Sequence, residues 1–321
     1  TMKEVNLRRA REIYHEISEV YRPIDWQKDF KSGYRWGAHR WFRPQEVAKK
    51  IGGDIKVPWE LSRLQHLPRF VLLYQLLPEE RDEIYREFRD QLLDFIAQNP
   101  VRMGVNHMCT MDVGIRVANI ALACSLWHWA GKNFDRAFER IVTDYLFQEC
   151  DFIRKNLEWS YYLTSNHYFA DIAGLLWGSA ILPACGARKR WLRFARNQIV
   201  REIRKQFYEE GSNGEGSVAY HRLTAEMALY SVALIHRLSL TGAIRDAGED
   251  IYERLEGAGL FMDAVGRPDG MFTQIGDNDS GLFFRLSITG ELIDSAKAGE
   301  RYRSLESYRP SPEDRIYLDE N

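Results

Sequence analysis

The feature that most constrains this chain is an almost unbroken series of segments with helical periodicity. In residues 5–20, apolar side chains recur every three or four positions, as they do on one face of a helix. The same spacing predicts helices over residues 61–77, 84–97, 112–130, 137–156, 166–182, 190–208 and 221–241. Strand-like alternation appears only in the short segment GLFFRLSI, residues 281–288. The sequence therefore predicts an all-α fold.

Several of these helices are apolar on more than one side, most clearly residues 112–130. Such helices must be covered by neighbours on several sides, so they have to pack in layers. An α/α toroid, with antiparallel helices in two concentric rings, meets this requirement, and so does a solenoid. Because no fixed-period repeat is visible, we expect the toroid. We assign it to residues 1–298, and we assign the charged, proline-containing residues 299–321 to a linker or surface tail.

Composition excludes several classes of protein. A hydrophobic content of 45% is ample for a buried core and excludes a disordered chain. The net charge of −2 gives no support for a nucleic-acid partner. Residues 188–205 are strongly basic, but we expect a solvated helix face there rather than a track for a polyanion.

Targeting and cofactor signals are also scarce. No apolar stretch reaches the roughly 18 residues of a membrane span, so none is expected. The first residues lack the apolar core of a secretion signal, and the compartment stays open. The four cysteines are spread out with no C-x-x-C pair, so we expect neither a disulfide framework nor a metal or other cofactor.

The segment SNHYFADI, residues 165–172, is the first candidate for chemistry. Ser165 is predicted to cap a helix whose first turn carries Asn166 and His167. A helix N-terminus offers free N–H groups and a partial positive charge, which suit a carboxylate. Asp171 follows His167 by one turn and is predicted to orient its ring or raise its pKa. The alternative, that Asn166 only caps and His167 belongs to the core, is equally open on spacing alone.

The second candidate is GSNGEGSVAYH, residues 211–221. Its glycines allow the backbone to approach a ligand closely, and it delivers Tyr220 and His221 to a helix start. A tyrosine beside a cation can act as base and then as acid, because positive charge lowers its pKa. By composition alone, Tyr220 is more often an ordinary half-buried aromatic residue.

Other segments offer residues that suit binding of an acidic sugar. A polar stripe on the helix 112–130 is either the wall of a cleft or an internal salt bridge. Arginine after Trp59 suits carboxylate or sulfate through paired hydrogen bonds. Trp36, Trp41 and Trp59 are candidates for stacking on sugar faces, with the core as the alternative. The acidic turn GDNDSG lacks the spacing of a calcium loop and is expected to lie near the cleft. The candidate binding residues are Glu60, Arg63, His66, Asp112, Arg116, Asn119, Glu215, His221, Asp277 and Asn278.

Together the two motifs resemble the heparinase II/III-like polysaccharide lyase family. In the family pattern SNHYFADIAGLL precedes DGSN-x-E-x-S-x-x-YHRL-x-x-E, and the second element stands here as EEGSNGEGSVAYHRLTAE. Blocks at residues 54–67, 104–123 and 268–281 fit the same family in the same order. The resemblance implies an α/α toroid followed by an antiparallel β-sandwich.

The resemblance also implies β-elimination on an acidic polysaccharide substrate. Asn166 matches the residue that neutralises the uronate carboxylate. Tyr220 matches the acid and, in syn elimination, the base as well. His167 is placed to polarise the carboxylate or to stabilise the enolate, whose developing charge calls for preorganised donors.

The sequence departs from the family pattern at several points. The β-sandwich is largely absent from these residues, so no histidine or metal site is expected from it. Asp112 stands where relatives commonly carry Glu, and Leu282 stands where they commonly carry Arg, with Arg285 as a candidate replacement. Two other functions stay open. One is a toroid glycoside hydrolase, for which no obvious pair of carboxylic acids is seen. The other is a non-catalytic domain that binds acidic polysaccharide.

Overall fold

The computed structural model describes residues 2–38, 41, 52–242, 244, 250–279 and 281–286. Two short 3-10 turns are η2 (Pro78–Glu80) and η3 (Val105–His107). The α-helices are α1 (Met2–Tyr14), α2 (Lys56–Ser62), α3 (Leu67–Leu76), α4 (Arg81–Gln98), α5 (Thr110–Trp129), α6 (Arg136–Lys155), α7 (Asn166–Ile181), α8 (Gly186–Gln206), α9 (Val218–Arg237) and α11 (Asp250–Ala264). In the described part of the chain, strand pairing is limited to isolated bridges. The predicted all-α architecture of toroid type is confirmed.

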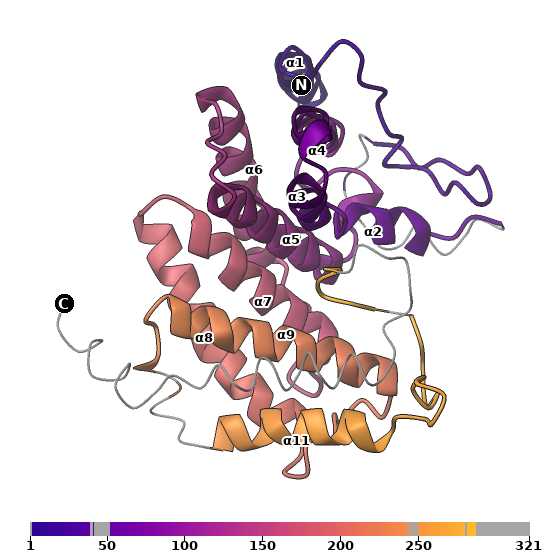
Figure 1. Ribbon diagram of the computed structural model, residues 1–321, viewed down its shortest axis with the longest axis vertical. Coiled ribbons are helices and arrows are strands. Elements are labelled where there is room, and N and C mark those ends of the chain that lie inside the picture. The colour runs from indigo at the N-terminus through magenta and orange to yellow at the C-terminus, as the bar shows by residue number, and fades with distance from the viewer. Residues whose placement is uncertain are drawn as a thin grey trace.

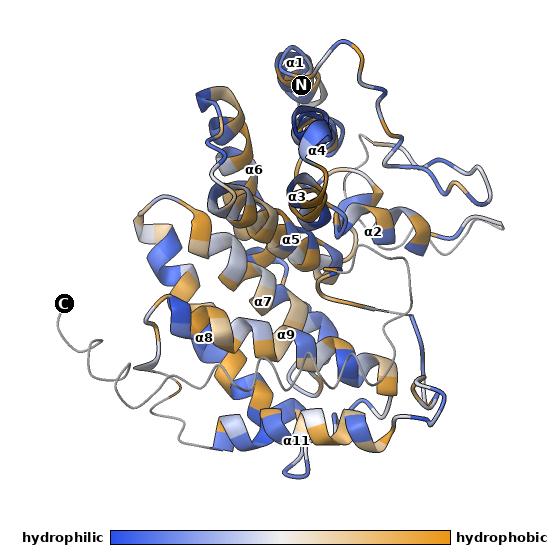
Figure 2. Cartoon of the chain, viewed as in Figure 1, coloured by the Kyte–Doolittle hydropathy of each residue, from blue (hydrophilic) through white to orange (hydrophobic). Residues whose placement is uncertain are grey.

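Helices α5 and α7 pack against each other through the middle of the molecule (Figure 1). On one side α3 packs on α5, α4 on α3, and α1 on α4; on the other, α8 and α9 pack on α7, and α11 on α9. The two central helices are largely apolar along their length (Figure 2). Their contact is close enough to require glycine: a Cβ at Gly174 would lie 2.3 Å from the Cα of Gly114.

Two predicted helices differ from what their periodicity indicates: one ends early and the other is interrupted. The helix predicted over 5–20 ends at Tyr14. The helix predicted over 61–77 is two helices, α2 and α3. Leu64 lies between them in the left-handed region, with a φ of 53°, and Pro68 opens α3, where its missing N–H costs nothing.

Near residue 282 the prediction of a strand is wrong, because residues 281–286 form no strand. Phe283 and Phe284 are fully buried in the helical core instead. Helix α11 was not predicted at all. The tail assigned to 299–321, and the end of the domain from 287 to 298, lie outside the described residues. None of the described helices is long and apolar enough to cross a membrane.

Candidate active site

The start of α7 holds a carboxylate, as its position at a helix N-terminus favours. Ser165 caps the helix by accepting a hydrogen bond from the His167 N–H at 3.3 Å. The Asn166 backbone N–H donates to Oε1 of Glu215 at 2.7 Å, and its Nδ2 donates to Oε2 at 2.6 Å. Asn166 is only 3% exposed. Amide and backbone thus converge on one carboxylate, which comes from the glycine-rich loop before α9.

His167 is paired with a glutamate that the sequence did not single out. Its Nδ1 lies 3.0 Å from Oε2 of Glu158, and the same oxygen accepts from the Met111 N–H at 3.0 Å. This hydrogen bond, with the charge of Glu158, raises the pKa of His167 above its ordinary value. When Nδ1 carries the proton shared with Glu158, Nε2 is left as an acceptor.

The prediction that Asp171 contacts the His167 ring is wrong. Asp171 is fully buried, and its Oδ2 accepts from the backbone N–H of Glu158 at 2.6 Å. Burial, with the nearby charge of Glu158, raises the pKa of Asp171 well above its ordinary value. Asp171 therefore fixes the segment that carries Glu158, and Glu158 in turn orients the imidazole.

Tyr220 is fixed at the start of α9 and points to an acidic residue. Ser217 caps this helix by accepting from the Tyr220 N–H at 3.2 Å. The phenol donates to Oδ2 of Asp279 at 2.9 Å, and Nζ of Lys56 donates to Oδ1 of Asp279 at 2.7 Å. Burial and this hydrogen bond to Asp279 raise the pKa of Tyr220 to about 12. The expected lowering of its pKa by a cation is wrong, because the carboxylate stands between Lys56 and the phenol.

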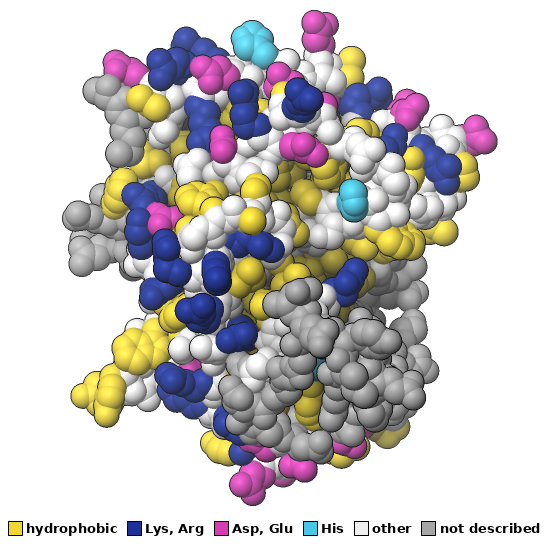
Figure 3. Space-filling model, turned by 90° about the vertical axis from the view of Figure 1, so that its left-hand side faces the viewer, with side chains coloured by type: hydrophobic (Ala, Val, Ile, Leu, Met, Phe, Trp, Pro, Cys, Tyr) yellow, Lys and Arg dark blue, Asp and Glu magenta, His cyan; other side chains and the backbone are white. Residues whose placement is uncertain are grey.

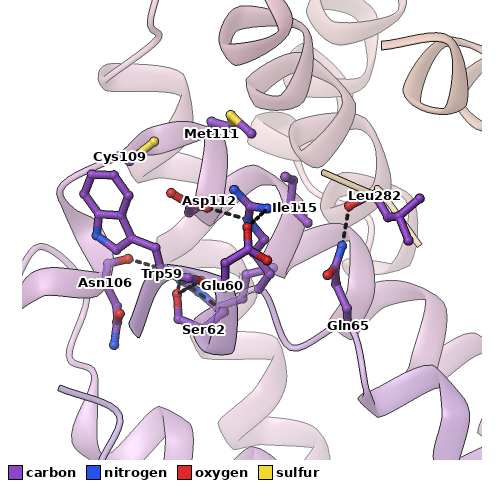
Figure 4. A network of polar contacts seen from close by, with 12 residues as sticks. Trp59, Glu60, Ser62, Gln65, Asn106, Cys109, Met111, Asp112, Ile115 and Leu282 are labelled. Carbon is purple, nitrogen blue, oxygen red and sulfur yellow. Dashed lines mark hydrogen bonds and ion pairs between the residues drawn. The ribbon is translucent and has the colours of Figure 1, made fainter. Parts of the chain in front are cut away.

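One wall of the site is built by α2 against the start of α5 (Figure 4). Arg63 is 6% exposed; its Nε donates to Oδ1 of Asp112 at 2.6 Å and one terminal nitrogen donates to Glu60 at 2.5 Å. Burial outweighs the attraction of Arg63 and raises the pKa of Glu60. Arg285 lies 3.9 Å from the other oxygen of Glu60. Its guanidinium therefore lies near this wall, and Arg285 stays a candidate to replace the arginine that relatives commonly carry at position 282.

Two residues of the predicted polar stripe on α5 face the core. Arg116 is 0% exposed and donates to Glu149 at 3.0 Å. Asn119 is also fully buried and donates to the carbonyl of Phe283 at 3.0 Å. For these two residues the internal interpretation of the stripe is the one that fits, and Asp112 alone lies beside the site.

The two further histidines proposed for binding are engaged inside the protein. His221 is 1% exposed; its Nδ1 accepts from the Asn213 N–H at 3.2 Å and its Nε2 lies 3.1 Å from the Ala258 carbonyl. His66 lies 2.9 Å from Oε1 of Gln91. Burial lowers the pKa of both rings to about 4, so both are neutral at pH 7.

The acidic turn contacts the start of α9 and the Tyr220 phenol. Asp277 accepts from Ser217 through its backbone carbonyl at 2.5 Å, and Asn278 donates to Gln274 at 2.7 Å. The side chain that reaches the phenol is that of Asp279. The turn therefore shapes this edge of the site and positions Tyr220.

Glu215 connects the two halves of the site. Its charge contributes to raising the pKa of His167 on α7 and that of Tyr220 on α9. Asn166 therefore binds the carboxylate of Glu215 directly, and the charge of that carboxylate acts on both His167 and Tyr220. Glu158, Lys56 and Asp279 complete the arrangement and were absent from the predicted site residues.

Cys109, Glu158 and His167 bring a thiol, a carboxylate and an imidazole together. Their ligand atoms lie within 4.8 Å of one another, a spacing that a transition-metal ion could bridge. Burial, with the charges of Asp112 and Glu158, raises the pKa of the Cys109 thiol, which opposes the thiolate form that a metal needs. Glu158 and His167 are hydrogen-bonded to each other, so both groups already have a partner without a metal ion.

The fold and the site together define a helical toroid-type domain with a polar centre in which Asn166 binds the carboxylate of Glu215. The chain belongs to the heparinase II/III family: the domain described as Heparinase II/III N-terminus matches residues 9–280.

One relative and two solved structures that are similar to this chain come from Pedobacter heparinus. Its heparin-sulfate lyase is 21% identical over 229 residues, which cover 70% of this chain and 33% of that protein. The crystal structure of heparan sulfate lyase HepC is similar with a TM-score of 0.51 at 21% identity, over 68% of this chain and 33% of that one. A mutant of that lyase gives 0.52 at 19% identity, over 82% and 39%. The chain thus spans about a third of the length of the lyase that it matches, and at this identity the structural similarity shows the fold alone.

Proposed function

We propose that this chain is the helical domain of a polysaccharide lyase that cleaves beside a uronate by β-elimination. The observation that carries the proposal is the carboxylate held at the start of α7 by the backbone N–H and the amide of Asn166, at 2.7 and 2.6 Å. These are the donors that would neutralise a uronate carboxylate in place of Glu215. Membership of the heparinase II/III family and the heparin-sulfate lyase among its relatives support an acidic polysaccharide as substrate.

In the proposed reaction, Asn166 neutralises the carboxylate and so makes the adjacent C5–H acidic. Nε2 of His167 removes that proton while Glu158 holds Nδ1. The C4–O bond breaks as the C4–C5 double bond forms, and Tyr220 gives its proton to the departing oxygen. The raised pKa keeps the Tyr220 phenol protonated, as a general acid must be, and opposes a phenolate base; for this reason we assign the base to His167. Exchange with water restores both groups.

The test is incubation with uronate polymers, namely heparan sulfate, alginate, glucuronan and bacterial capsules, while following the ultraviolet absorbance of the unsaturated product. We expect Tyr220→Phe to lower kcat by about 10²–10⁴-fold, the usual contribution of a positioned proton donor. Asn166→Ala should lower it by about 10²–10³-fold, the loss typical of one preorganised donor.

Tyr208→Phe is the matched control, because this tyrosine is 55% exposed and precedes the glycine-rich loop; it should keep wild-type activity. Full activity in Tyr220→Phe would refute the assignment of the acid. Cleavage without a new absorbance would instead indicate a glycoside hydrolase, and binding without cleavage would indicate a binding domain.

A further inference from the structure

The connection between α6 and α7 exposes an unusual group of large side chains. Trp159 is 55% exposed, Tyr161 81%, Tyr162 92% and Leu163 67%. We call residues 159–163 the aromatic loop. Isolated exposed apolar residues are ordinary, but a contiguous group of this kind marks a surface that binds something.

The aromatic loop is ordered by its own contacts. Oγ of Ser160 donates to the carbonyl of Leu163 at 2.8 Å and accepts from its N–H at 3.0 Å, which closes a turn. The rings of Tyr161 and Tyr162 meet edge to face, with centroids 5.4 Å apart and planes at 87°. The rings are therefore presented in a defined arrangement, which lowers the entropy lost when a ligand binds.

Both ends of the aromatic loop reach the candidate active site. Glu158, directly before it, holds His167, and Asn166 follows shortly after it. Thr164 donates to Glu202 of α8 at 2.7 Å, which anchors the far end of the loop. A polymer that lies across the reacting groups would therefore meet the aromatic rings next.

Cations border the aromatic loop on two sides. Arg154 and Lys155 end α6 just before it, and Arg201 precedes Glu202 on α8; all three are exposed. The charges of Arg154 and Arg201 both act on Tyr168 in the first turn of α7. Figure 3 shows Lys and Arg side chains gathered over this side of the molecule, where α6 and α8 lie in Figure 1. Aromatic rings stack on the C–H faces of sugars, while guanidinium groups bind carboxylate or sulfate through hydrogen bonds.

We propose that the aromatic loop is a binding platform for the acidic polysaccharide chain beyond the units that react. The identity of the ligand rests on the proposed function. The bordering cations argue for a polyanion, because an apolar protein partner would desolvate Arg154, Arg201 and the Lys155–Asp151 ion pair without replacing the lost hydration.

The experiment compares the wild type with the triple variant Trp159→Ala/Tyr161→Ala/Tyr162→Ala. Binding of each uronate polymer is measured by calorimetry, and elimination is followed in parallel by absorbance. We expect the Kd, and KM where there is turnover, to rise at least about tenfold for the polymer, with kcat unchanged. A tetrasaccharide, too short to span both surfaces, should show a much smaller change.

Trp129→Ala is the matched control. This tryptophan is 75% exposed but lies at the far end of the 20-residue α5 from the site, so the variant should bind as the wild type does. Trp159→Phe/Tyr161→Phe/Tyr162→Phe keeps the rings and should keep most of the affinity. If the triple alanine variant does not fold, Tyr162→Ala alone, at the most exposed ring, carries the comparison.

Each outcome decides the proposal separately from the proposed function. Weaker polymer binding by the alanine variant supports the platform even if the wild type forms no unsaturated product. Failure to form that product would contradict only the lyase assignment. Equal binding by the two proteins overturns the platform while leaving any elimination activity intact. Absence of polymer binding by the wild type also overturns it. The proposal is also overturned if sedimentation shows that the wild type is a dimer and the alanine variant a monomer. The aromatic loop would then be an interface between two copies of the chain.

Discussion

The hydrogen bond from His167 to Glu158 sets how the site should respond to pH. It raises the pKa of His167, so the neutral imidazole that can accept a proton forms only above that raised value. We expect kcat/KM to rise with pH through this pKa and then to stay level, because Tyr220 keeps its proton until about pH 12. Glu158→Gln should move the rising limb to lower pH and lower the plateau, since the ring loses its charged partner.

The measurement is kcat/KM for a cleaved polymer from pH 5 to 10. Glu209→Gln, at an exposed position on another loop, is the control. It should not move the rising limb of the pH profile. A limb that does not move in Glu158→Gln would show that another group titrates as the base.

Local signals predicted only part of this site. Ser165 and Ser217 are typical N-cap residues, so the sequence could place Asn166 and Tyr220 in the first turns of their helices. The partners of Tyr220 could not, because they come from distant segments: Lys56 and Asp279, which meet beside its phenol, are separated by 223 positions. No periodic pattern records such a pairing, and only the packing of the helices creates it.

Pairs of helices determine whether the reacting groups meet. The contact of α5 with α7 brings the start of one helix, with Asp112, beside the start of the other, with Asn166. An added Cβ at Gly174 would lie 2.4 Å from the carbonyl oxygen of Gly114. We expect Gly174→Ala to destabilise the protein by about 1–3 kcal/mol through overpacking, despite the better helix propensity of alanine.

Urea unfolding measures this loss, and kcat should fall as well, because α7 must move away from α5. The control is Gly186→Ala in the first turn of α8, where a Cβ would meet only the flexible end of Arg190 at 3.3 Å. That variant should be neutral or slightly stabilised. Unchanged stability in Gly174→Ala would mean that the two backbones can separate at little cost.

Periodicity predicted most helices because their stability comes from burying one face. The residues on that face are apolar and recur every three or four positions in the sequence. It missed the break between α2 and α3, since Leu64 has no side-chain signal for its left-handed backbone. It also read the apolar residues Phe283 and Phe284 as a strand. These two side chains are buried in the helical core, so they are apolar although their segment forms no strand.

For the molecule as a whole, a buried charged cluster holds the first half of the chain together. Glu149 on α6 accepts from Arg116 on α5 at 3.0 Å and lies 3.1 Å from His107 in η3, and all three are 0% exposed. Burial alone would raise the pKa of Glu149, but the charges of His107 and Arg116 outweigh it and lower the pKa to about 2. The stability that Glu149 contributes is therefore complete above its ordinary pKa of 4.5 and is lost as the pH falls toward 2.

Arg116→Met should cost about 3–5 kcal/mol at pH 7, because it removes the guanidinium that is ion-paired with a buried carboxylate. The deficit relative to the wild type, measured by urea unfolding, should narrow below pH 4.5, where Glu149 becomes protonated more readily in the variant. Arg140→Met, at an exposed position on the same helix as Glu149, should stay within about 0.5 kcal/mol of the wild type. If Arg116→Met proves as stable as the wild type at pH 7, packing of the methionine has replaced the ion pair. The cluster would then serve to fix the register of α5 against α6, and with it the position of Asp112 at the site, rather than to stabilise the fold.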